Sequence, residues 1–399
     1  MRVLVAGVST RAAAESLARA GFAVTAIDAF GDLDQHRLVR ASSLEGAFTA
    51  RAAVRAARSV ECDAVVYLAN FENHPNAVKA LAEGRALWGN PPEVIRRVRD
   101  PMLLAEVLRK RGLATPRVRL KPDTTSVTST GGEPHASQSY AASGFSRTVD
   151  DWLVKPLASG GGQRIRRWHR GEALPPGCYL QELITGDPGS VVFVAAGGRA
   201  VLLGISRQLV GDQAFGASAY HYCGNILAEE GLGLADTASA LASAVTGEFG
   251  LVGLNGIDFI VRDGIPCAIE VNPRWCASME LVERAWGFPV LDAHASACRA
   301  GALPAFDLPE PPGAGWKGPA AFGKAVVYAR RDVAVGDTRS WLSRGDIRDI
   351  PRSGERIPAG RPVCTVFATG LDANACHEAL IGSAVQVYAQ LEKWETGTA

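Results

Sequence analysis

The chain has 399 residues, of which 47% are hydrophobic and 21% charged, and its formal net charge is +1. This length is too great for one hydrophobic core and indicates two to four domains of ordinary globular composition. The near-zero charge gives no global field that would favour nucleic acid or an anionic membrane, so we expect neither as a partner. No apolar run approaches the roughly 18 residues that suggest a membrane span.

The opening run, MRVLVAGVST, is too short for the apolar region of a signal peptide and is more typical of a first strand. The eight Cys residues are scattered without a C-x-x-C pair, so neither a zinc site nor a disulfide framework is indicated. We expect a cytoplasmic protein with reduced thiols.

Residues 1–98 alternate strand and helix signals, which predicts an open parallel sheet of Rossmann-like type. The strands are VLVAG, FAVTAID and DAVVYLA, and the helix RAAAESLARAG is closed by Gly21. Asp28 ends the second strand, where a dinucleotide fold would hold a ribose. The loop after the first strand, GVSTRAA, lacks the pattern G-x-G-x-x-G, so we expect this layer to bind no NAD.

Residues 99–310 are predicted to form a second domain, and residues 311–399 a small C-terminal α+β domain after a Pro/Gly-rich linker. A helix ends near Gly112, and a Ser/Thr/Gly/Pro-rich insert follows at about residues 121–150. Residues 124–142 have too little apolar content to offset ordering entropy, so we expect them to be mobile. The C-terminal part shows two strands, KAVVYARR and RPVCTVFATG, and a closing helix from DANACHEAL onward.

The stretch AIEVNPRWCA begins as a buried strand and then places an acid, an amide and a guanidinium at two-residue spacing. Glu270, Asn272 and Arg274 therefore share one face of the strand. Oxygen ligands beside an Arg suit Mg²⁺ that holds a phosphate chain, although an exposed polar edge is the simpler alternative.

The preceding strand, GIDFIV, is joined to this one by Arg-Asp-Gly, which is typical of a hairpin. A two-residue loop would turn Asp258 away from Glu270, whereas a three-residue loop with a left-handed Gly264 would pair Asp258 with Ala268 and keep the face shared. We predict the three-residue loop, and with Asn272 an all-oxygen site for a divalent cation.

Two further motifs precede this hairpin. In WLVKPLASGGGQRI, Lys155 closes an apolar strand and Gly160, Gly161 and Gly162 form a turn whose amides suit phosphates, without the G-K-[ST] of a Walker loop. In CYLQELITGDPGS, a short strand runs into a turn whose backbone suits an adenine edge.

The order of these motifs resembles the ATP-grasp superfamily over roughly residues 1–300. The E-x-N-x-R strand twelve residues after an acid is its most specific mark. Within the superfamily, the chain looks most like carboxylate–amine ligase-like proteins related to biotin carboxylase, a group that includes the tyramine–glutamate ligase type. The resemblance implies an ATP-grasp fold with a Rossmann-like N-terminal domain and a small C-terminal domain, and ATP with Mg²⁺ (or Mn²⁺) as cofactors.

The resemblance also implies residue roles. Lys155 would contact the ATP phosphates, the glycine triplet would form a mobile lid, and Arg274 would steady a phosphate or acyl phosphate. The cation would be held by Asp258, Glu270 and Asn272. The adenine and ribose would be met by Gln181, Glu182, Leu183, Ile184 and Asp187, with Glu182 and Ile184 acting through their backbones.

One position departs from the pattern of many relatives, which carry a first ATP-binding Lys at the start of the helix before the insert. Here the sequence reads Arg99-Asp100-Pro101, so Arg96 or Arg99 is the candidate substitute.

The sequence leaves the role of two further segments open and also contains one candidate nucleophile, Cys276. FGASAYHYCGN, with His221 between two tyrosines, suits a substrate contact or loop packing equally. NFENHP follows a strand end where open α/β sheets bind ligands, and its His74 suits a substrate contact or a helix cap. Cys276 is expected to pack rather than react, since no base is identifiable beside it.

The expected activity is ATP-dependent ligation of a small-molecule carboxylate to an amine through an acyl phosphate, with release of ADP and phosphate. The alternatives are a bicarbonate-phosphorylating carboxylase or a nucleotide-binding module without turnover. A homodimer is left open, and the sequence names neither the acid nor the amine.

Overall fold

The computed structural model describes residues 1–44, 48–120, 152–308 and 319–396. The insert predicted at about residues 121–150, and its predicted mobility, lie outside these described residues.

The N-terminal part is a parallel sheet with the strand order β3-β2-β1-β4-β5, as the alternating pattern predicts. Its strands are β1 (Arg2–Ala6), β2 (Ala23–Asp28), β3 (Val39–Ser43), β4 (Ala64–Tyr67) and β5 (Ala86–Trp88). Its helices are α1 (Arg11–Arg19), α2 (Ala50–Ala57), α3 (Pro75–Leu81) and α4 (Pro92–Val98). Asp28 is buried and accepts from the Thr10 hydroxyl and the amide of Gly31, so both its oxygens serve the fold.

An eight-stranded sheet follows, with the order β14-β13-β10-β11-β12-β15-β19-β17. Its strands are β10 (Asp187–Ala196), β11 (Arg199–Val210), β12 (Tyr222–Leu227), β13 (Gly253–Arg262), β14 (Ile265–Asn272), β15 (Ala321–Tyr328), β17 (Ile347–Arg348) and β19 (Pro362–Gly370). Both predicted C-terminal strands are present and extend this sheet through the β12–β15 pair. The domain boundaries at residues 98/99 and 310/311 remain predictions.

The third sheet is a small antiparallel lobe with the order β6-β9-β7-β8. Its strands are β6 (Val118–Arg119), β7 (Trp152–Pro156), β8 (Arg166–Arg167) and β9 (Cys178–Glu182). A two-stranded pair, β16 (Val333–Ala334) and β18 (Arg356–Ile357), lies in the C-terminal part. Short 3-10 helices are η1 (Phe71–Asn73), η2 (Gln213–Phe215), η3 (Glu229–Leu234) and η4 (Arg339–Ser343).

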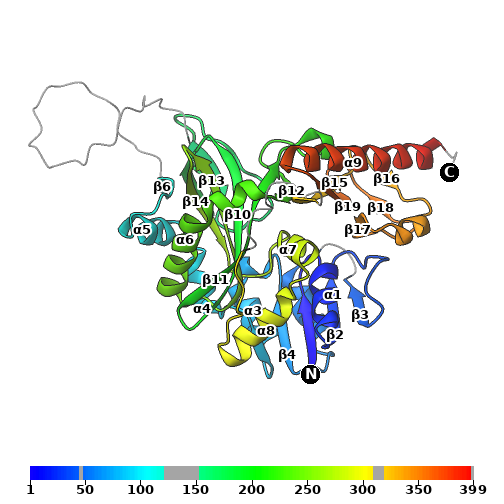
Figure 1. The fold of residues 1–399 in the computed structure, drawn as a ribbon. Coiled ribbons are helices and arrows are strands. Elements are labelled where there is room, and N and C mark those ends of the chain that lie inside the picture. Colours follow the sequence, from blue (N-terminus) through cyan, green and yellow to red (C-terminus); the bar gives the residue numbers. More distant parts are fainter. Residues whose placement is uncertain (45–47, 121–151, 309–318, 397–399) are drawn as a thin grey trace, which may run out of the picture.

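Helices cover the sheets in a layered arrangement (Figure 1). They are α5 (Pro101–Lys110), α6 (Ala235–Phe249), α7 (Met279–Trp286), α8 (Val290–Ala300) and α9 (Ala373–Thr396). α9 lies along β15 and β19, and α6 packs on β10 and β11. One apolar cluster contains Leu17 of α1, Val192 of β10 and Leu291 of α8, so a continuous core joins the parallel sheet to the large sheet. In the described part of the chain, no helix has the length and apolar character that a bilayer crossing requires.

The hairpin of β13 and β14 corrects the predicted loop. β13 ends at Arg262 and pairs with Ile265, so the loop has two residues, and both of these, Asp263 and Gly264, have positive φ (54° and 74°). This is the geometry of a tight hairpin turn, and Gly at the second position makes it accessible. By itself, a two-residue loop would turn Asp258 to the face of the sheet away from Glu270.

A β-bulge restores the face. The register shifts between Asp258 and Phe259, so Asp258 lies opposite Glu270, with Ile269 as the extra residue. The shared face predicted for Asp258 and Glu270 is therefore present, but a bulge produces it rather than a longer loop.

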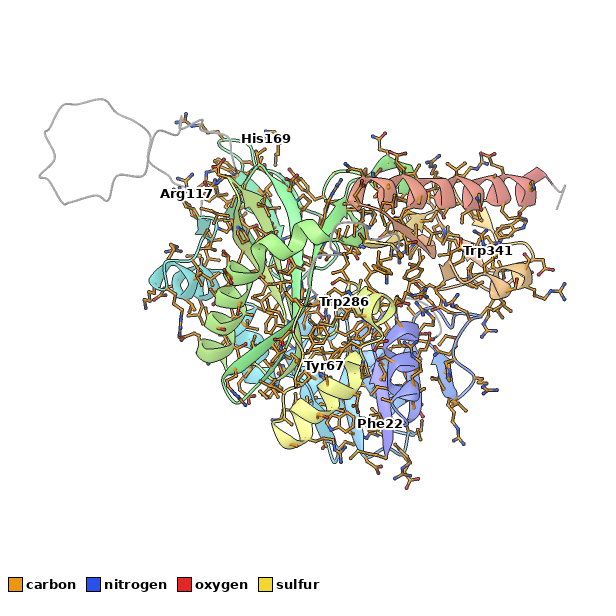
Figure 2. All side chains as sticks on the ribbon, viewed as in Figure 1. Phe22, Tyr67, Arg117, His169, Trp286 and Trp341 are labelled. Carbon is orange, nitrogen blue, oxygen red and sulfur yellow. The ribbon has the colours of Figure 1, made fainter. Side chains whose placement is uncertain are left out.

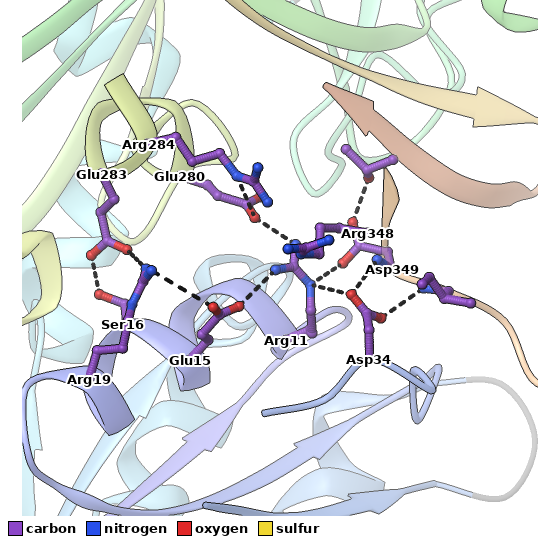
Figure 3. Close-up of polar contacts among 12 residues, drawn as sticks. Arg11, Glu15, Ser16, Arg19, Asp34, Glu280, Glu283, Arg284, Arg348 and Asp349 are labelled. Atoms are coloured by element: carbon purple, nitrogen blue, oxygen red, sulfur yellow. Dashed lines mark hydrogen bonds and ion pairs between the residues drawn. The ribbon is translucent and has the colours of Figure 1, made fainter. Parts of the chain in front are cut away.

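A buried ionic cluster ties the N-terminal, central and C-terminal parts together (Figure 3). Arg11 of α1 is only 1% exposed, and its guanidinium lies 2.7 Å from Glu280 of α7 and 2.8 Å from Asp349, just past β17. Lys324 of β15 pairs with the other oxygen of Glu280 at 2.7 Å. These contacts hold the three parts in register around the site described next.

Candidate nucleotide and metal site

The metal face consists of Asp258, Glu270 and Asn272 on the adjacent strands β13 and β14. Asp258 and Glu270 are directly opposite each other, and the amide of Asn272 donates to Asp258 Oδ2 at 2.9 Å. Two carboxylates and an amide oxygen are the donor set that Mg²⁺ prefers, so the residues present fit such a cation. The described residues contain no group of three or more His, Cys, Asp or Glu that could hold a metal by themselves.

The two carboxylates of the metal face have opposite electrostatic surroundings. Burial and the neighbouring Glu270 raise the pKa of Asp258 to about 6. Burial also acts to raise the pKa of Glu270, but the nearby charges of Arg99 and Lys155 outweigh it, and this pKa is lowered. Glu270 is thus the carboxylate that stays ionised most readily.

Sequence reasoning missed Gln208 on β11, whose side-chain amide donates to Asp258 Oδ1 at 2.8 Å. The two oxygens of Asp258 are therefore oriented by two amides, those of Gln208 and Asn272. The signal for Gln208 was weak, because a single Gln in the strand RAVLLGISRQLV shows no special spacing to the motif residues.

Lys155 is buried at the end of β7 and donates to Gln181 Oε1 at 3.0 Å. Gln181 in turn donates to the carbonyl of Ile269, the bulge residue, at 3.2 Å. Gln181 therefore links the small lobe to β14 and positions Lys155 over the metal face. The adenine contact that the resemblance implies for Gln181 stays a prediction.

Arg99 lies at the junction of α4 and α5. The carboxylate of Asp100 caps α5 by accepting from the amides of Met102 (2.9 Å) and Leu103 (3.2 Å), and Pro101 opens the helix. This capped entry places the Arg99 side chain in the site, where Nη1 donates to Glu270 Oε1. The other candidate substitute, Arg96, lies at the surface, where it donates to Asn76 at 2.7 Å.

Arg274 follows the metal face and pairs with a carboxylate from the N-terminal part. Its Nε and Nη2 lie 2.8 and 2.7 Å from Glu72 Oε1, and Nη2 also donates to Asn272 Oδ1 at 3.2 Å. Glu72 is in η1, within the segment NFENHP after β4, so this segment enters the site. His74 of the same segment is at the start of α3, where its side chain makes no capping hydrogen bond.

The glycine triplet is docked on the segment 220–222. The amide of Tyr222 donates to the carbonyl of Gly161 at 3.1 Å. Gly162 has φ +75°, and a Cβ atom there would lie 1.7 Å from the Tyr220 carbonyl oxygen. Only glycine permits this approach, so the docking of the triplet depends on Gly162.

The contacts with adenine and ribose that the resemblance implies for residues 181–187 remain a prediction. Ile184 is buried just after β9, and Asp187 starts β10 in an exposed position. The backbone amide of Glu182 donates to the carbonyl of Arg117 at 2.8 Å, and the Glu182 side chain accepts from the amide of Arg117 at 3.0 Å. A nucleotide contact through the Glu182 N–H would therefore have to displace Arg117.

Cys276 packs rather than reacts. Burial raises the pKa of its thiol to about 12, which keeps it protonated at neutral pH, and the thiol approaches the carbonyl of Arg274 at 3.5 Å. Gly256 leaves room for it, because a Cβ there would lie 2.5 Å from the Cys276 sulfur.

The site balances three cations against three carboxylates. The cations are Arg99, Lys155 and Arg274, and the carboxylates are Glu72, Asp258 and Glu270. The cavity between Arg99, Lys155 and Glu270 is about 20 Å³, room for about one water. A nucleotide therefore requires this cavity to widen.

A comparison with models of protein families matches residues 98–278 to the ATP-grasp domain. The chain thus contains an ATP-grasp domain, with the metal face, Lys155, the glycine triplet and Arg274 all inside the matched range. A sequence comparison with curated proteins finds no match.

Solved structures share the fold over nearly the whole chain. One is the biotin carboxylase domain of the Hydrogenobacter thermophilus 2-oxoglutarate carboxylase, solved with MgADP and bicarbonate (TM-score 0.63, 15% identity, 92% of this chain and 86% of that chain). Another is an L-amino acid ligase from Bacillus licheniformis (TM-score 0.62, 16% identity, 96% and 97%). A third is N5-carboxyaminoimidazole ribonucleotide synthetase from Thermotoga maritima (TM-score 0.60, 13% identity, 96% and 97%). The expected likeness to ligases and to biotin carboxylase is confirmed at the level of the fold.

Proposed function

We propose that this protein is an ATP-dependent carboxylate–amine ligase that forms an amide through an acyl phosphate and releases ADP and phosphate. The observation that carries the proposal is the metal face with Lys155 and Arg274 beside it. This constellation has oxygen ligands for cations next to two fixed positive charges, which is the arrangement that phosphoryl transfer to a carboxylate requires.

The charge balance supports a fully charged nucleotide. A site with three cations and three carboxylates is close to neutral, and ATP with two divalent cations adds no net charge. Asp258, Glu270 and Asn272 would hold the cation, which would supply charge neutralisation at the terminal phosphates when bound.

The chain's own residues perform positioning and charge stabilisation in this proposal. Lys155, held by Gln181, binds the transferring phosphate as a point charge. Arg274, held by Glu72, orients the carboxylate and then the acyl phosphate. The glycine triplet, docked on the segment 220–222, excludes water from an intermediate that water would hydrolyse.

A screen for ADP release against a panel of amino acids and amines, with Mg²⁺ present, tests the proposal. We expect ADP only when both an acid and an amine are supplied. AMP and pyrophosphate as products would contradict it. ADP formed with bicarbonate and biotin and without an amine would favour the carboxylase, and nucleotide binding without any turnover would favour the non-catalytic module.

A further inference from the structure

The Arg99 guanidinium contacts three separate parts of the candidate site. Nη1 donates to Glu270 Oε1 and to the carbonyl of Val271 at 3.2 Å, both on β14. Nη2 lies 3.4 Å from Asn73 Oδ1 in η1 and 3.5 Å from the carbonyl of Ser159. Ser159 immediately precedes the glycine triplet, so Arg99 reaches from the metal face to the base of the lid.

Asn73 reinforces the same link, because its side-chain amide donates to the Ser159 carbonyl at 3.3 Å. The lid base is therefore held by two donors, one on Arg99 and one on Asn73. The Arg99 side chain is only 12% exposed, and its buried Nε has no hydrogen-bond partner among the described residues. A buried guanidinium with an unused N–H can donate one more hydrogen bond, for example to a phosphate oxygen.

We propose that Arg99 is a positioning residue that couples Glu270 to the lid, so that occupancy of the metal face by a divalent cation and closure of the glycine triplet depend on each other. The proposal rests on the proposed function for the identity of the cation and the nucleotide. The physical reason is that one rigid, planar group cannot follow a movement of Glu270 without changing its contacts at Ser159.

Hydrogen exchange of the amides at residues 158–165 measures lid closure directly and needs no turnover. In the unsubstituted protein, we expect ADP with Mg²⁺ to slow this exchange about tenfold more than ADP alone, the size of a typical coupling between two sites. In Arg99→Gln, the exchange should be about tenfold faster without nucleotide, because the lid base loses a charged donor. The extra protection from Mg²⁺ should also disappear.

Arg99→Lys separates the two contacts. An ammonium retains a charge for Glu270 but lacks the second nitrogen that reaches Asn73 and Ser159. The Mg²⁺ concentration needed for ADP binding, measured by calorimetry, should stay within about threefold of the unsubstituted value. Lid exchange should nevertheless be as fast as in Arg99→Gln.

Arg96→Gln is the matched control, since Arg96 is on the same helix end but pairs with Asn76 at the surface. It should change neither measurement. Asn73→Ala provides a second route if Arg99→Gln folds poorly, because it removes a lid contact and leaves the Arg99–Glu270 pair in place. It should speed lid exchange and, because the Arg99 link to Glu270 remains, raise the Mg²⁺ concentration needed for ADP binding.

The proposal is overturned if Arg99→Gln and Arg96→Gln show the same lid exchange, or if the extra protection from Mg²⁺ persists in Arg99→Gln. These outcomes are distinct from a failure of the proposed function. That failure would appear as an absence of ADP release with every acid and amine, whatever the exchange at residues 158–165 shows.

Discussion

At the scale of single residues, the site is organised by pairs that each join two parts of the chain. Arg274 is fixed by Glu72, Lys155 by Gln181, and Glu270 by Arg99. Preorganised charges of this kind need little rearrangement when charge develops during a reaction. Each pair therefore offers a substitution that removes one charge and leaves the backbone intact.

Replacing Glu270 by Gln should lower ADP release at least about a hundredfold, because several kcal/mol of charge stabilisation are lost with the ionised metal ligand. Circular dichroism should show an unchanged fold. Glu248→Gln is the control, since Glu248 lies at the surface and pairs loosely with Arg97 at 3.7 Å and with Arg111 at 3.8 Å. Near-normal ADP release by Glu270→Gln at saturating Mg²⁺ would show that the metal face is wrongly assigned.

Some residues of the site could be predicted from the sequence, and others could not. The spacing of Glu270, Asn272 and Arg274 predicts their shared face, because strand periodicity is local. The partners Glu72 and Gln208 come from distant elements, and nothing local distinguishes them from other polar residues. Arg99 was visible only as a departure from the usual Lys, and its contacts required the fold.

At the scale of elements, the face predicted for Asp258 and Glu270 in the β13–β14 hairpin is correct, although the predicted loop length is wrong. The pattern predicts a three-residue connection, whereas the chain combines a two-residue turn with a bulge at Ile269. Both solutions shift the register by one residue, and sequence periodicity does not distinguish them. The carbonyl of Ile269 accepts from Gln181, so the bulge also connects the small lobe to β14.

The docking of the glycine triplet can be tested by adding one methyl group. Gly162→Ala places a Cβ where the Tyr220 carbonyl lies and favours a backbone with negative φ. We expect weaker lid closure and roughly tenfold weaker binding of ATP, measured by calorimetry. Gly160→Ala is the matched control, because no atom lies within 4 Å of its added Cβ. Equal binding by the two variants would show that the docked position does not matter.

His294 of α8 joins the parallel sheet to β13. Its Nδ1 accepts from the amide of Leu254 at 2.9 Å, so the proton is on Nε2, which lies 3.3 Å from the carbonyl of Trp88. Burial lowers the pKa of this ring from 6.5 to about 4. A lowered pKa in the folded state means that the contribution to stability is present above pH 6.5 and is lost as the pH falls from 6.5 towards 4.

Folding stability should therefore fall by about 3 kcal/mol from this group over that range. His294→Gln has no titrating ring, so its free energy of unfolding in urea should depend less on pH between 6.5 and 4 than that of the unsubstituted protein. Parallel pH profiles for the two proteins would rule out this role for His294.

At the scale of the whole molecule, three parts of the chain meet at the buried cluster of Arg11, Glu280 and Asp349 (Figure 3). The side chains fill the space between the parallel sheet and the large sheet, where Tyr67 and Trp286 are labelled in Figure 2. Tyr67 donates to the carbonyl of Pro273, directly before Arg274. The relative placement of these parts therefore bears directly on the site.

Arg11→Ala should destabilise the protein by about 3–5 kcal/mol, because buried carboxylates lose their partner. Urea unfolding measures this change. Lys110→Ala is the control: Lys110 pairs with Glu106 at 2.6 Å, both side chains are more than half exposed, and such a pair contributes about 1 kcal/mol or less. Equal losses in the two variants would show that the buried cluster has no special role.

Most of the architecture could be predicted, because the parallel layer and the C-terminal strands and helix each carry a local pattern. The joining of the C-terminal strands to the central sheet could not, since the β12–β15 pair connects residues about one hundred positions apart. Such pairing depends on which edge is free in three dimensions, and no local pattern in either strand specifies it.

The central claim is that a substrate carboxylate attacks the terminal phosphate of ATP at the metal face. It is tested most directly by the fate of ¹⁸O placed in the carboxylate of the acid that the ADP-release screen identifies. In the presence of the amine, the acyl-phosphate mechanism predicts one labelled oxygen in the released inorganic phosphate and none in any nucleotide. Label recovered in AMP, or phosphate that carries no label while the amide forms, would contradict it.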